Sequence, residues 1–380
     1  MISIFRSPLL AILACAIGAT GLAQRAPDAV EVAFVANAEG AEVALVDVAA
    51  RAIIGTVGVN FAEVEASGPG APNYAQDTDV SPDGRTLYVS RGYLGDVAAF
   101  DIASGRPLWT RPLNTMRADH MTLTRDGRDL FVSAFVDNRV YRLSSAGEIT
   151  GHFASGIFPH DVKVSKDGRR LFNSSLGQMP SFPLPAGARP PLEKPEVPVQ
   201  LTIADAGTLA IRDRIPLEIA MRPWHFNADE TGIFAELSNQ HAIIFFDLAA
   251  RKVTRRLDLP MKAGITDKDW DFEAPFHGLA LTDDGATLCL AGRASDYAAL
   301  VRASDLTLIA TVPVGDGPGW AETADGGRVC LIANTRSDDL SFVSIADRKE
   351  ILRMPIGNGP KHITVARVPV AVVNDVKARY

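Results

Sequence analysis

The chain alternates apolar and polar residues over short runs that are separated by turn residues. Between residues 77 and 111 four such runs follow one another, at Asp77–Ser81, Thr86–Ser90, Asp96–Phe100 and Pro107–Arg111. Period-2 alternation of β-branched and aromatic residues is typical of strands, and an Asp-Gly pair between two runs predicts a hairpin. The segment therefore predicts four short antiparallel strands. Helical periodicity is absent beyond the first 23 residues, so we expect no helix there.

One phrase of this pattern recurs along most of the chain. It stands as Val80-Ser81-Pro82-Asp83-Gly84-Arg85-Thr86-Leu87-Tyr88-Val89 and returns, with changes, around Gly127, Gly168, Gly232, Gly285 and Gly327. Successive turn glycines lie 43, 41, 64, 53 and 42 residues apart, so two of the five intervals contain insertions. Four strands in a repeat of this length correspond to one blade of a β-propeller.

Counting the repeats predicts an all-β fold, a single seven-bladed β-propeller of four-stranded antiparallel blades over residues 24–380. The first unit, between Val30 and Val59, supplies only three of its four strands. The missing strand follows the last repeat, at residues 362–366, so a C-terminal strand is expected to complete the first blade and remove an exposed sheet edge. Blades two to seven are expected to begin near Asp77, His120, His160, His225, His277 and Trp320.

Two insertions interrupt the repeats. Residues 176–200 are rich in proline and lie between the second and third strands of blade four, whereas residues 261–274 are acidic and aromatic and precede blade six. In a propeller both connections open onto the face where the innermost strands begin. Long loops in compact domains are often functional and otherwise simple excursions, and both interpretations stay open.

The N-terminus has the features of a secretory signal peptide. Arg6 precedes an apolar stretch from Leu9 to Leu22, and Gly21-Leu22-Ala23 provides small residues at a cleavage site. Residues 1–23 are therefore predicted to be a signal peptide, and the mature protein to be periplasmic or secreted. A lipoprotein acylated at Cys15 is the weaker alternative. No other apolar run reaches the length of a membrane span.

Charge and composition exclude several classes of function. The net charge is −7 without a basic block, which argues against a nucleic-acid partner. No Cys-x-x-Cys-His is present for covalent haem, and no nucleophile elbow, P-loop or His-Glu-x-x-His is found. Cys289 and Cys330 occupy equivalent second strands. Two buried thiols are the favoured interpretation, and a disulfide between neighbouring blades is the alternative.

The repeated phrase, together with Gly357-Asn358-Gly359-Pro360 before a final strand, resembles the YVTN-type β-propeller repeat. That superfamily overlaps in sequence with quinoprotein amine dehydrogenase heavy chains and with seven-bladed lactonases. The resemblance covers nearly all of the mature chain. It implies a seven-bladed propeller but no particular reaction.

Histidines recur at the start of the innermost strands. Aligning the blades by their turns places five of the seven histidines at this point, namely His120, His160, His225, His277 and His362. They are candidate ligands for a divalent metal ion or an anion, because neutral imidazole is a common ligand of transition metals. The alternative is that each ring packs between blades and satisfies a strand-end backbone group.

Other polar and aromatic residues accompany the histidines on the same rim. The candidate ligand-binding residues are Asp77, Arg91, Asp119, Arg222, Arg293, Trp320, Arg336 and Lys361. Central pockets are the usual binding sites of ring-shaped folds.

Three functions follow from these observations. The first is an exported propeller that binds a metal ion or small anionic ligand at the channel mouth, as an accessory to a periplasmic oxidative pathway. The second is a lactonase or metal-assisted lyase that uses the same rim. The third is a scaffold that binds a periplasmic protein partner.

Overall fold

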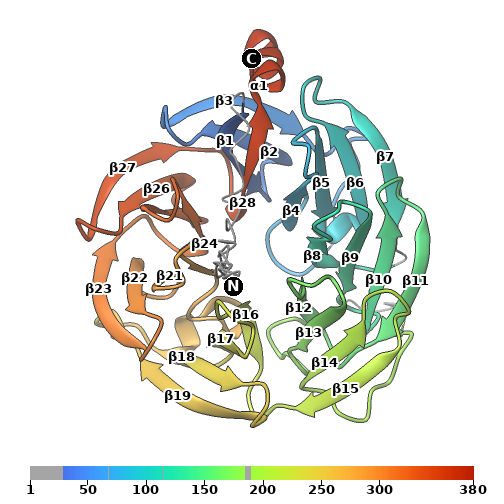
Figure 1. Cartoon of the computed structure of the whole chain (residues 1–380), viewed down its shortest axis with the longest axis vertical. Coiled ribbons are helices and arrows are strands. Elements are labelled where there is room, and N and C mark those ends of the chain that lie inside the picture. Colours follow the sequence, from blue (N-terminus) through green and yellow to red (C-terminus); the bar gives the residue numbers. More distant parts are fainter. Residues whose placement is uncertain (1–28, 67, 114, 185–189) are drawn as a thin grey trace, which may run out of the picture.

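The computed structural model describes residues 29–66, 68–113, 115–184 and 190–380, so the predicted signal peptide lies outside the described residues. Within these ranges seven four-stranded antiparallel sheets surround a central channel (Figure 1), which confirms the predicted fold. Each blade runs from an innermost strand beside the channel to an outermost strand at the rim.

The innermost strand is given first for each blade. Blade 1 contains β28 (Pro360–Pro369), β1 (Ala29–Asn37), β2 (Glu42–Asp47) and β3 (Ala52–Gly58). Blade 2 contains β4 (Asp77–Val80), β5 (Thr86–Arg91), β6 (Asp96–Asp101) and β7 (Pro107–Pro112). Blade 3 contains β8 (Ala118–Leu123), β9 (Asp129–Ala134), β10 (Arg139–Ser144) and β11 (Ile149–Ala154). Blade 4 contains β12 (Pro159–Val164), β13 (Arg170–Ser175), β14 (Gln200–Asp205) and β15 (Ile211–Pro216).

The remaining blades follow the same order. Blade 5 contains β16 (Met221–Phe226), β17 (Gly232–Leu237), β18 (Gln240–Asp247) and β19 (Lys252–Asp258). Blade 6 contains β20 (Leu279–Leu281), β21 (Thr287–Gly292), β22 (Tyr297–Arg302) and β23 (Thr307–Pro313). Blade 7 contains β24 (Pro318–Ala324), β25 (Val329–Asn334), β26 (Asp339–Ser344) and β27 (Lys349–Pro355). Short 3₁₀ helices lie at η1 (Gly92–Leu94), η2 (Asp267–Asp269) and η3 (Asp271–Glu273).

The C-terminal strand closes the ring as predicted. β28 pairs antiparallel with β1 from Ala29 opposite Pro369 to Asn37 opposite Pro360. Because β28 is the innermost strand of blade 1, it also packs beside β24 and β4 of the neighbouring blades.

Carboxylate side chains join neighbouring blades through hydrogen bonds to the backbone. Asp79 of blade 2 accepts the backbone N–H of Leu123 at 2.8 Å, and Asp161 of blade 4 accepts that of Trp224 at 3.0 Å. Glu236 of blade 5 accepts the N–H of Gly278 at 2.8 Å. Each side chain satisfies a backbone donor at the inner strand of the next blade, as buried polar groups require.

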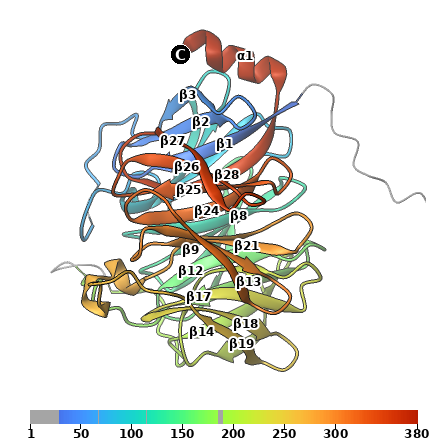
Figure 2. The ribbon, with the colours of Figure 1, turned by 90° about the vertical axis from the view of Figure 1, so that its left-hand side faces the viewer.

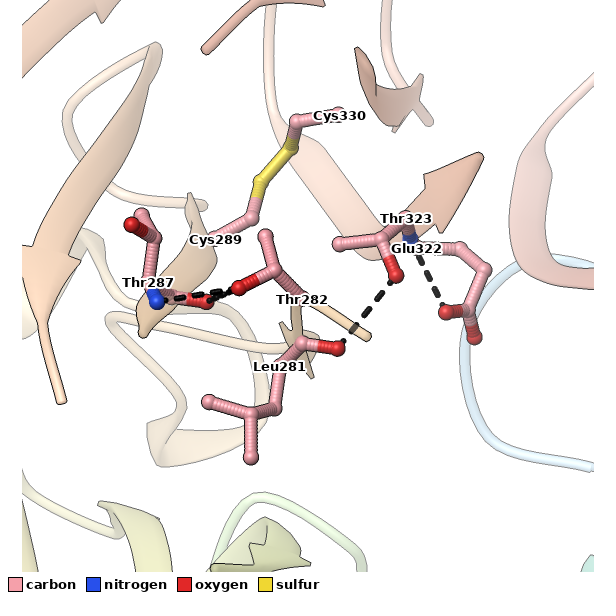
Figure 3. The surroundings of a disulfide bond; sticks show 7 residues. All are labelled: Leu281, Thr282, Thr287, Cys289, Glu322, Thr323 and Cys330. Carbon is pink, nitrogen blue, oxygen red and sulfur yellow. Dashed lines mark hydrogen bonds between the residues drawn. A yellow bond between two sulfur atoms is a disulfide. The ribbon is translucent and has the colours of Figure 1, made fainter. Parts of the chain in front are cut away.

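Cys289 of β21 and Cys330 of β25 form a disulfide between blades 6 and 7 (Figure 3), with Cα atoms 6.2 Å apart. The expectation of two buried thiols is therefore wrong. The two positions are equivalent in their repeats, so the rotation between blades brings them into bridging range.

A helix at the C-terminus is the main departure from the expected all-β pattern. α1 (Val370–Arg379) packs on β3 at the outer edge of blade 1 (Figure 2) and buries Val372, Val373 and Val376. Valine has a low helix propensity, so this segment carries no clear helical signal in the sequence. Among the described residues no helix has the length and apolar character needed to cross a bilayer.

Candidate functional site

The innermost strands are irregular where they begin, and this irregularity positions the candidate residues. The register with the second strand shifts between Ala118 and Met121 in β8, between Pro159 and Val162 in β12, and between Met221 and Trp224 in β16. A bulge of this kind re-aims side chains that would otherwise alternate regularly. Two successive residues inside each bulge are thereby placed at the channel.

Four of the five predicted histidines converge in the middle of the channel. The ring of His120 lies 4.5 Å from that of His160, 6.0 Å from that of His277 and 5.8 Å from that of His362, measured between ring centroids. Trp320 closes the cluster, with its ring 4.0 Å from the ring of His362 and 5.2 Å from the ring of His120.

The structure places His225 apart from this imidazole cluster. Met221 pairs with Leu237 as Pro159 pairs with Ser175, so the residue of blade 5 that corresponds to His160 is Arg222. His225 lies three residues further along β16, and its Nδ1 contacts its neighbour's carbonyl at 2.6 Å. The offset arises in the turn that follows the strand. Glu230, with φ 56°, takes the place of Gly168, and Gly232 corresponds to Arg170, so alignment on the turn glycines misplaced this strand.

Hydrogen bonds fix the orientation of two imidazoles. Nδ1 of His120 lies 2.8 Å from Oδ2 of Asp77, and Nδ1 of His277 lies 3.0 Å from the carbonyl oxygen of Gly319. A carbonyl oxygen only accepts, so Nδ1 of His277 carries the proton; an ionised Asp77 requires the same of His120. Both Nε2 atoms are then acceptors.

Three ring nitrogens in the cluster lack hydrogen-bond partners among the described residues. They are Nε2 of His120, Nδ1 of His160 and Nδ1 of His362. One nitrogen each of His120, His160 and His277 lies within 4.8 Å of the other two, and Asp77, His120 and His362 form a second such group. Nδ1 of His362 lies 3.1 Å from Oδ1 of Asp77.

Burial controls the protonation of the cluster. Desolvation, reinforced by neighbouring cationic groups, holds the pKa values of His160 and His277 well below the usual range. Burial also works against protonation of His120, but the hydrogen bond to Asp77 and the nearby carboxylates outweigh it and raise the pKa of His120. His160 and His277 are therefore neutral, and His120 is the strongest base of the three.

A small cavity, here called the chamber, adjoins the cluster where the inner strands begin. Its volume is about 20 Å³, which is room for about one water molecule. Its polar lining consists of Arg117, His160, Arg222, His277, Arg293 and Lys361. The expected channel mouth is thus a narrow, largely covered space.

The two insertions cover the chamber. Leu176 and Met179 of the proline-rich insertion and Phe272 of the acidic insertion line its wall. The backbone N–H of Ser181 donates to Oε1 of Glu273 at 3.2 Å, which joins one insertion to the other. In Figure 2 the short helical turns of the acidic insertion project from one face of the disc.

Cationic side chains outnumber the carboxylates that face them in the chamber. Asp119 pairs with Arg117 at 3.1 Å, Glu273 lies 3.8 Å from Arg222, and Asp271 lies 3.4 Å from Arg293. Lys361 has no ion-pair or hydrogen-bond partner within the described chain.

Burial and mutual repulsion lower the pKa values of these cations. Burial, together with Arg117 and Arg293, lowers the pKa of Lys361 to about 7. Burial lowers the pKa of Arg222 to about 9, and the neighbouring arginines add to this effect. A buried excess of positive charge favours an anionic ligand.

The other predicted ligand-binding residues lie outside the chamber. Arg91 is buried against Asp96, with Nε 2.6 Å from Oδ1, and donates to the carbonyl of Val59 at 2.9 Å. Arg336 is on the outer surface and pairs with Asp271 at 3.0 Å and with Asp316 at 3.2 Å. Asp77 and Trp320 belong to the imidazole cluster rather than to the chamber.

The opposite end of the channel opens as a funnel of about 650 Å³. Its lining includes Asp161, Trp320 and His362 near the starts of their strands, together with Lys163, His225 and Glu322 from further along the strands. Seven carboxylate residues line the funnel against three Lys and Arg residues. Sequence reasoning placed the site only at the other end and missed this cavity.

Sequence reasoning also missed Arg117 and Glu236. Arg117 stacks on Phe135, with the guanidinium carbon 4.5 Å from the ring centroid. The only signal for it was its place two residues before Asp119. Glu236 is fully buried, and burial holds its pKa well above the usual range. It lies in a second strand, where no repeat-wide pattern of polar residues marks it.

No family model matches the chain, and no curated protein matches it in sequence. Solved structures do resemble it. Kuenenia stuttgartiensis hydrazine synthase aligns with a TM-score of 0.64 and 18% identity, over 82% of this chain and 92% of that chain. Pseudomonas aeruginosa periplasmic gluconolactonase PpgL aligns with a TM-score of 0.64 and 20% identity, over 90% of this chain and 100% of that one. Both support the seven-bladed fold, and the resemblance to the YVTN repeat stays a prediction.

Proposed function

We propose that the chamber binds a small organic anion and that the protein hydrolyses a small lactone there. The observation that carries this proposal is the buried excess of cations, with Lys361 unpaired and Arg222 and Arg293 only loosely paired. Lactone hydrolysis develops negative charge on a carbonyl oxygen and leaves a carboxylate. Fixed cationic donors in a space closed to bulk water stabilise both.

The imidazole cluster supplies the proton acceptors for this reaction. Water adds to the lactone carbonyl carbon and gives up a proton to His160, which faces the chamber. The ring C–O bond then breaks and its oxygen takes up a proton, so the products are a hydroxy acid anion and one released proton. Asp77 orients His120, which lies beside His160 and is the stronger base of the two.

The test uses the purified chain, D-glucono-1,5-lactone and a panel of other small lactones and carboxylates. Arg222→Gln is expected to lower kcat/KM at least 100-fold and to abolish thermal stabilisation by the carboxylate products. The matched control, Arg302→Gln, removes an exposed arginine on β22 and should change neither. Hydrolysis that survives Arg222→Gln, or absence of carboxylate binding to the wild-type protein, would refute the proposal.

A metal site is the second candidate, and one observation favours it. The nitrogens of His120, His160 and His277 lie within 4.8 Å of one another, and Asp77 and Gly319 orient two of the rings in the manner of outer-shell partners. A divalent ion would act as a Lewis acid toward the carbonyl. Metal analysis separates the candidates, because stoichiometric metal that is lost in a His160→Ala/His277→Ala variant supports this one.

We also propose that the protein acts outside the cytoplasm, in the periplasm or beyond it. The disulfide between Cys289 and Cys330 supports this, because such bonds persist in oxidising compartments. The predicted signal peptide at residues 1–23 points the same way.

A further inference from the structure

The acidic insertion places its own carboxylates on the cations of the chamber. Oε2 of Glu273 lies 3.8 Å from Nη2 of Arg222, and Oδ2 of Asp271 lies 3.4 Å from Nε of Arg293. Charge-assisted hydrogen bonds normally measure about 2.7–2.9 Å. Both contacts are therefore loose, and neither matches the 3.1 Å pairing of Arg117 with Asp119.

The backbone that carries these carboxylates is strained. Phe272 has φ 51° and ψ 32°, and Glu273 has φ 62°. Two successive residues other than glycine in the left-handed region are costly, and such strain persists only where surrounding contacts hold it. The contacts that hold Glu273 include the N–H of Asn239, which donates to its carbonyl at 2.8 Å, and that of Ser181, which donates to its side chain. Asp271 is held by Arg336 at 3.0 Å, outside the chamber, and by Arg293 at 3.4 Å.

The size of the chamber shows that the insertion and a ligand cannot share it. About 20 Å³ holds about one water molecule, whereas an organic acid of several carbon atoms needs several times that volume. Phe272 forms part of the chamber wall, and Glu273 follows it directly. An organic ligand of the chamber must therefore displace part of this wall, and the segment with Phe272 and Glu273 is the part whose carboxylate faces Arg222.

We propose that Asp271 and Glu273 act as an internal competitor of the ligand. This inference rests on the proposed anion-binding function. The two carboxylates occupy the positions at Arg293 and Arg222 that the anionic groups of the ligand take. Ligand binding therefore displaces the insertion, and this displacement relieves the strain in its backbone. The ligand is accordingly a small carboxylate that replaces Glu273 at Arg222.

A purely structural role for the carboxylates leads to different expectations. If Glu273 only neutralised Arg222, its removal would leave Arg222 without a facing carboxylate. The insertion would stay in place, and access to the chamber would not change. If it is a competitor, its removal loosens the insertion and strengthens ligand binding at the same time. Hydrogen exchange of the insertion and ligand affinity therefore have to be measured together.

The experiment compares the wild-type chain with Glu273→Gln, which keeps the shape and removes the charge. The matched control is Asp267→Asn, which removes one charge from the same insertion at an exposed residue outside the chamber lining. Calorimetry measures the affinity for D-gluconate, and amide hydrogen exchange follows peptides that cover residues 261–274. We expect Glu273→Gln to lower Kd about 10-fold, which corresponds to about 1.4 kcal/mol. We also expect its insertion to exchange faster, while the control resembles wild type.

A second signature comes from the wild-type chain, in which saturating D-gluconate should accelerate exchange of residues 261–274. Weaker or unchanged gluconate binding by Glu273→Gln, or stronger protection of the insertion by gluconate, would overturn the inference. If the insertion exchanges faster in Glu273→Gln but no carboxylate binds either protein, the contact is shown to hold the segment and the proposed function fails. If gluconate binds both proteins equally and the insertion exchanges equally in both, the inference fails while the proposed function stands.

Discussion

Glu322 provides a test of the electrostatics of the funnel. It lies on β24, lines the open cavity, and accepts a hydrogen bond at 2.9 Å from the N–H of Thr323, its neighbour in the chain (Figure 3). Burial raises the pKa of Glu322 from the usual 4.5 to about 7, and Lys163 opposes this effect only in part. The folded protein therefore carries a carboxyl group that resists ionisation.

The sign of the effect on stability follows from proton binding. Below pH 4.5 the group is protonated in the folded and unfolded states alike, and it costs nothing. Between pH 4.5 and about 7 only the folded state keeps the proton, so stability falls as the pH rises. Above pH 7 the full cost is present. A pKa change from 4.5 to about 7 corresponds to about 3 kcal/mol, and solvent in the open funnel reduces this to about 1–2 kcal/mol.

Glu322→Gln removes the ionisable group and keeps its size. Urea denaturation at pH 4, 6 and 8 should show the variant equal to wild type at pH 4 and more stable by about 1–2 kcal/mol at pH 8. Glu65→Gln, at an exposed residue away from the funnel, is the control and should shift neither value. A stability difference that does not depend on pH, or a variant less stable at pH 8, would refute the reasoning.

Two further predictions concern the closure of the ring. Ending the chain after Pro369 removes Val372, Val373 and Val376 from their site on β3, and at about 1.5 kcal/mol per buried valine we expect the free energy of unfolding to fall by about 4–5 kcal/mol; an unchanged urea midpoint would contradict this. Replacing both Cys289 and Cys330 by alanine opens a link with a sequence separation of 41 residues, which should cost about 4 kcal/mol. Equal melting temperatures of the oxidised protein and the variant would argue against it.

The fold was predictable because the turn residues recur from blade to blade, even where the packed side chains of the strands differ. Asp83-Gly84 and its counterparts fix the hairpins, and Gly84 adopts φ 67°, which favours glycine. The closing strand followed from counting, since an incomplete first blade leaves an open edge. The helix at Val370–Arg379 could not be predicted, because buried valines on β3 stabilise it rather than its own propensity.

The candidate site was predictable in part. The rule that residues at blade starts face the channel identified His120, His160, His277 and His362, and the structure brings these together. It misaligned His225, because Glu230 occupies the left-handed turn position that Gly168 has in blade 4, and alignment on Gly232 hid the correspondence of Arg222 with His160. The covering of the chamber depends on contacts between distant insertions, such as Ser181 with Glu273, which no local pattern encodes.

The starts of β12 and β28 help to explain why the two ends of the channel differ in charge. In β12 His160 lines the chamber and Asp161 the funnel, and in β28 Lys361 lines the chamber and His362 the funnel. Cations consequently gather at the closed end and carboxylates at the open end. An anion that entered through the funnel would first meet acidic side chains and then the packed imidazoles. On the proposed function, an anionic ligand would therefore reach Arg222 from the covered side, past the segment that carries Glu273.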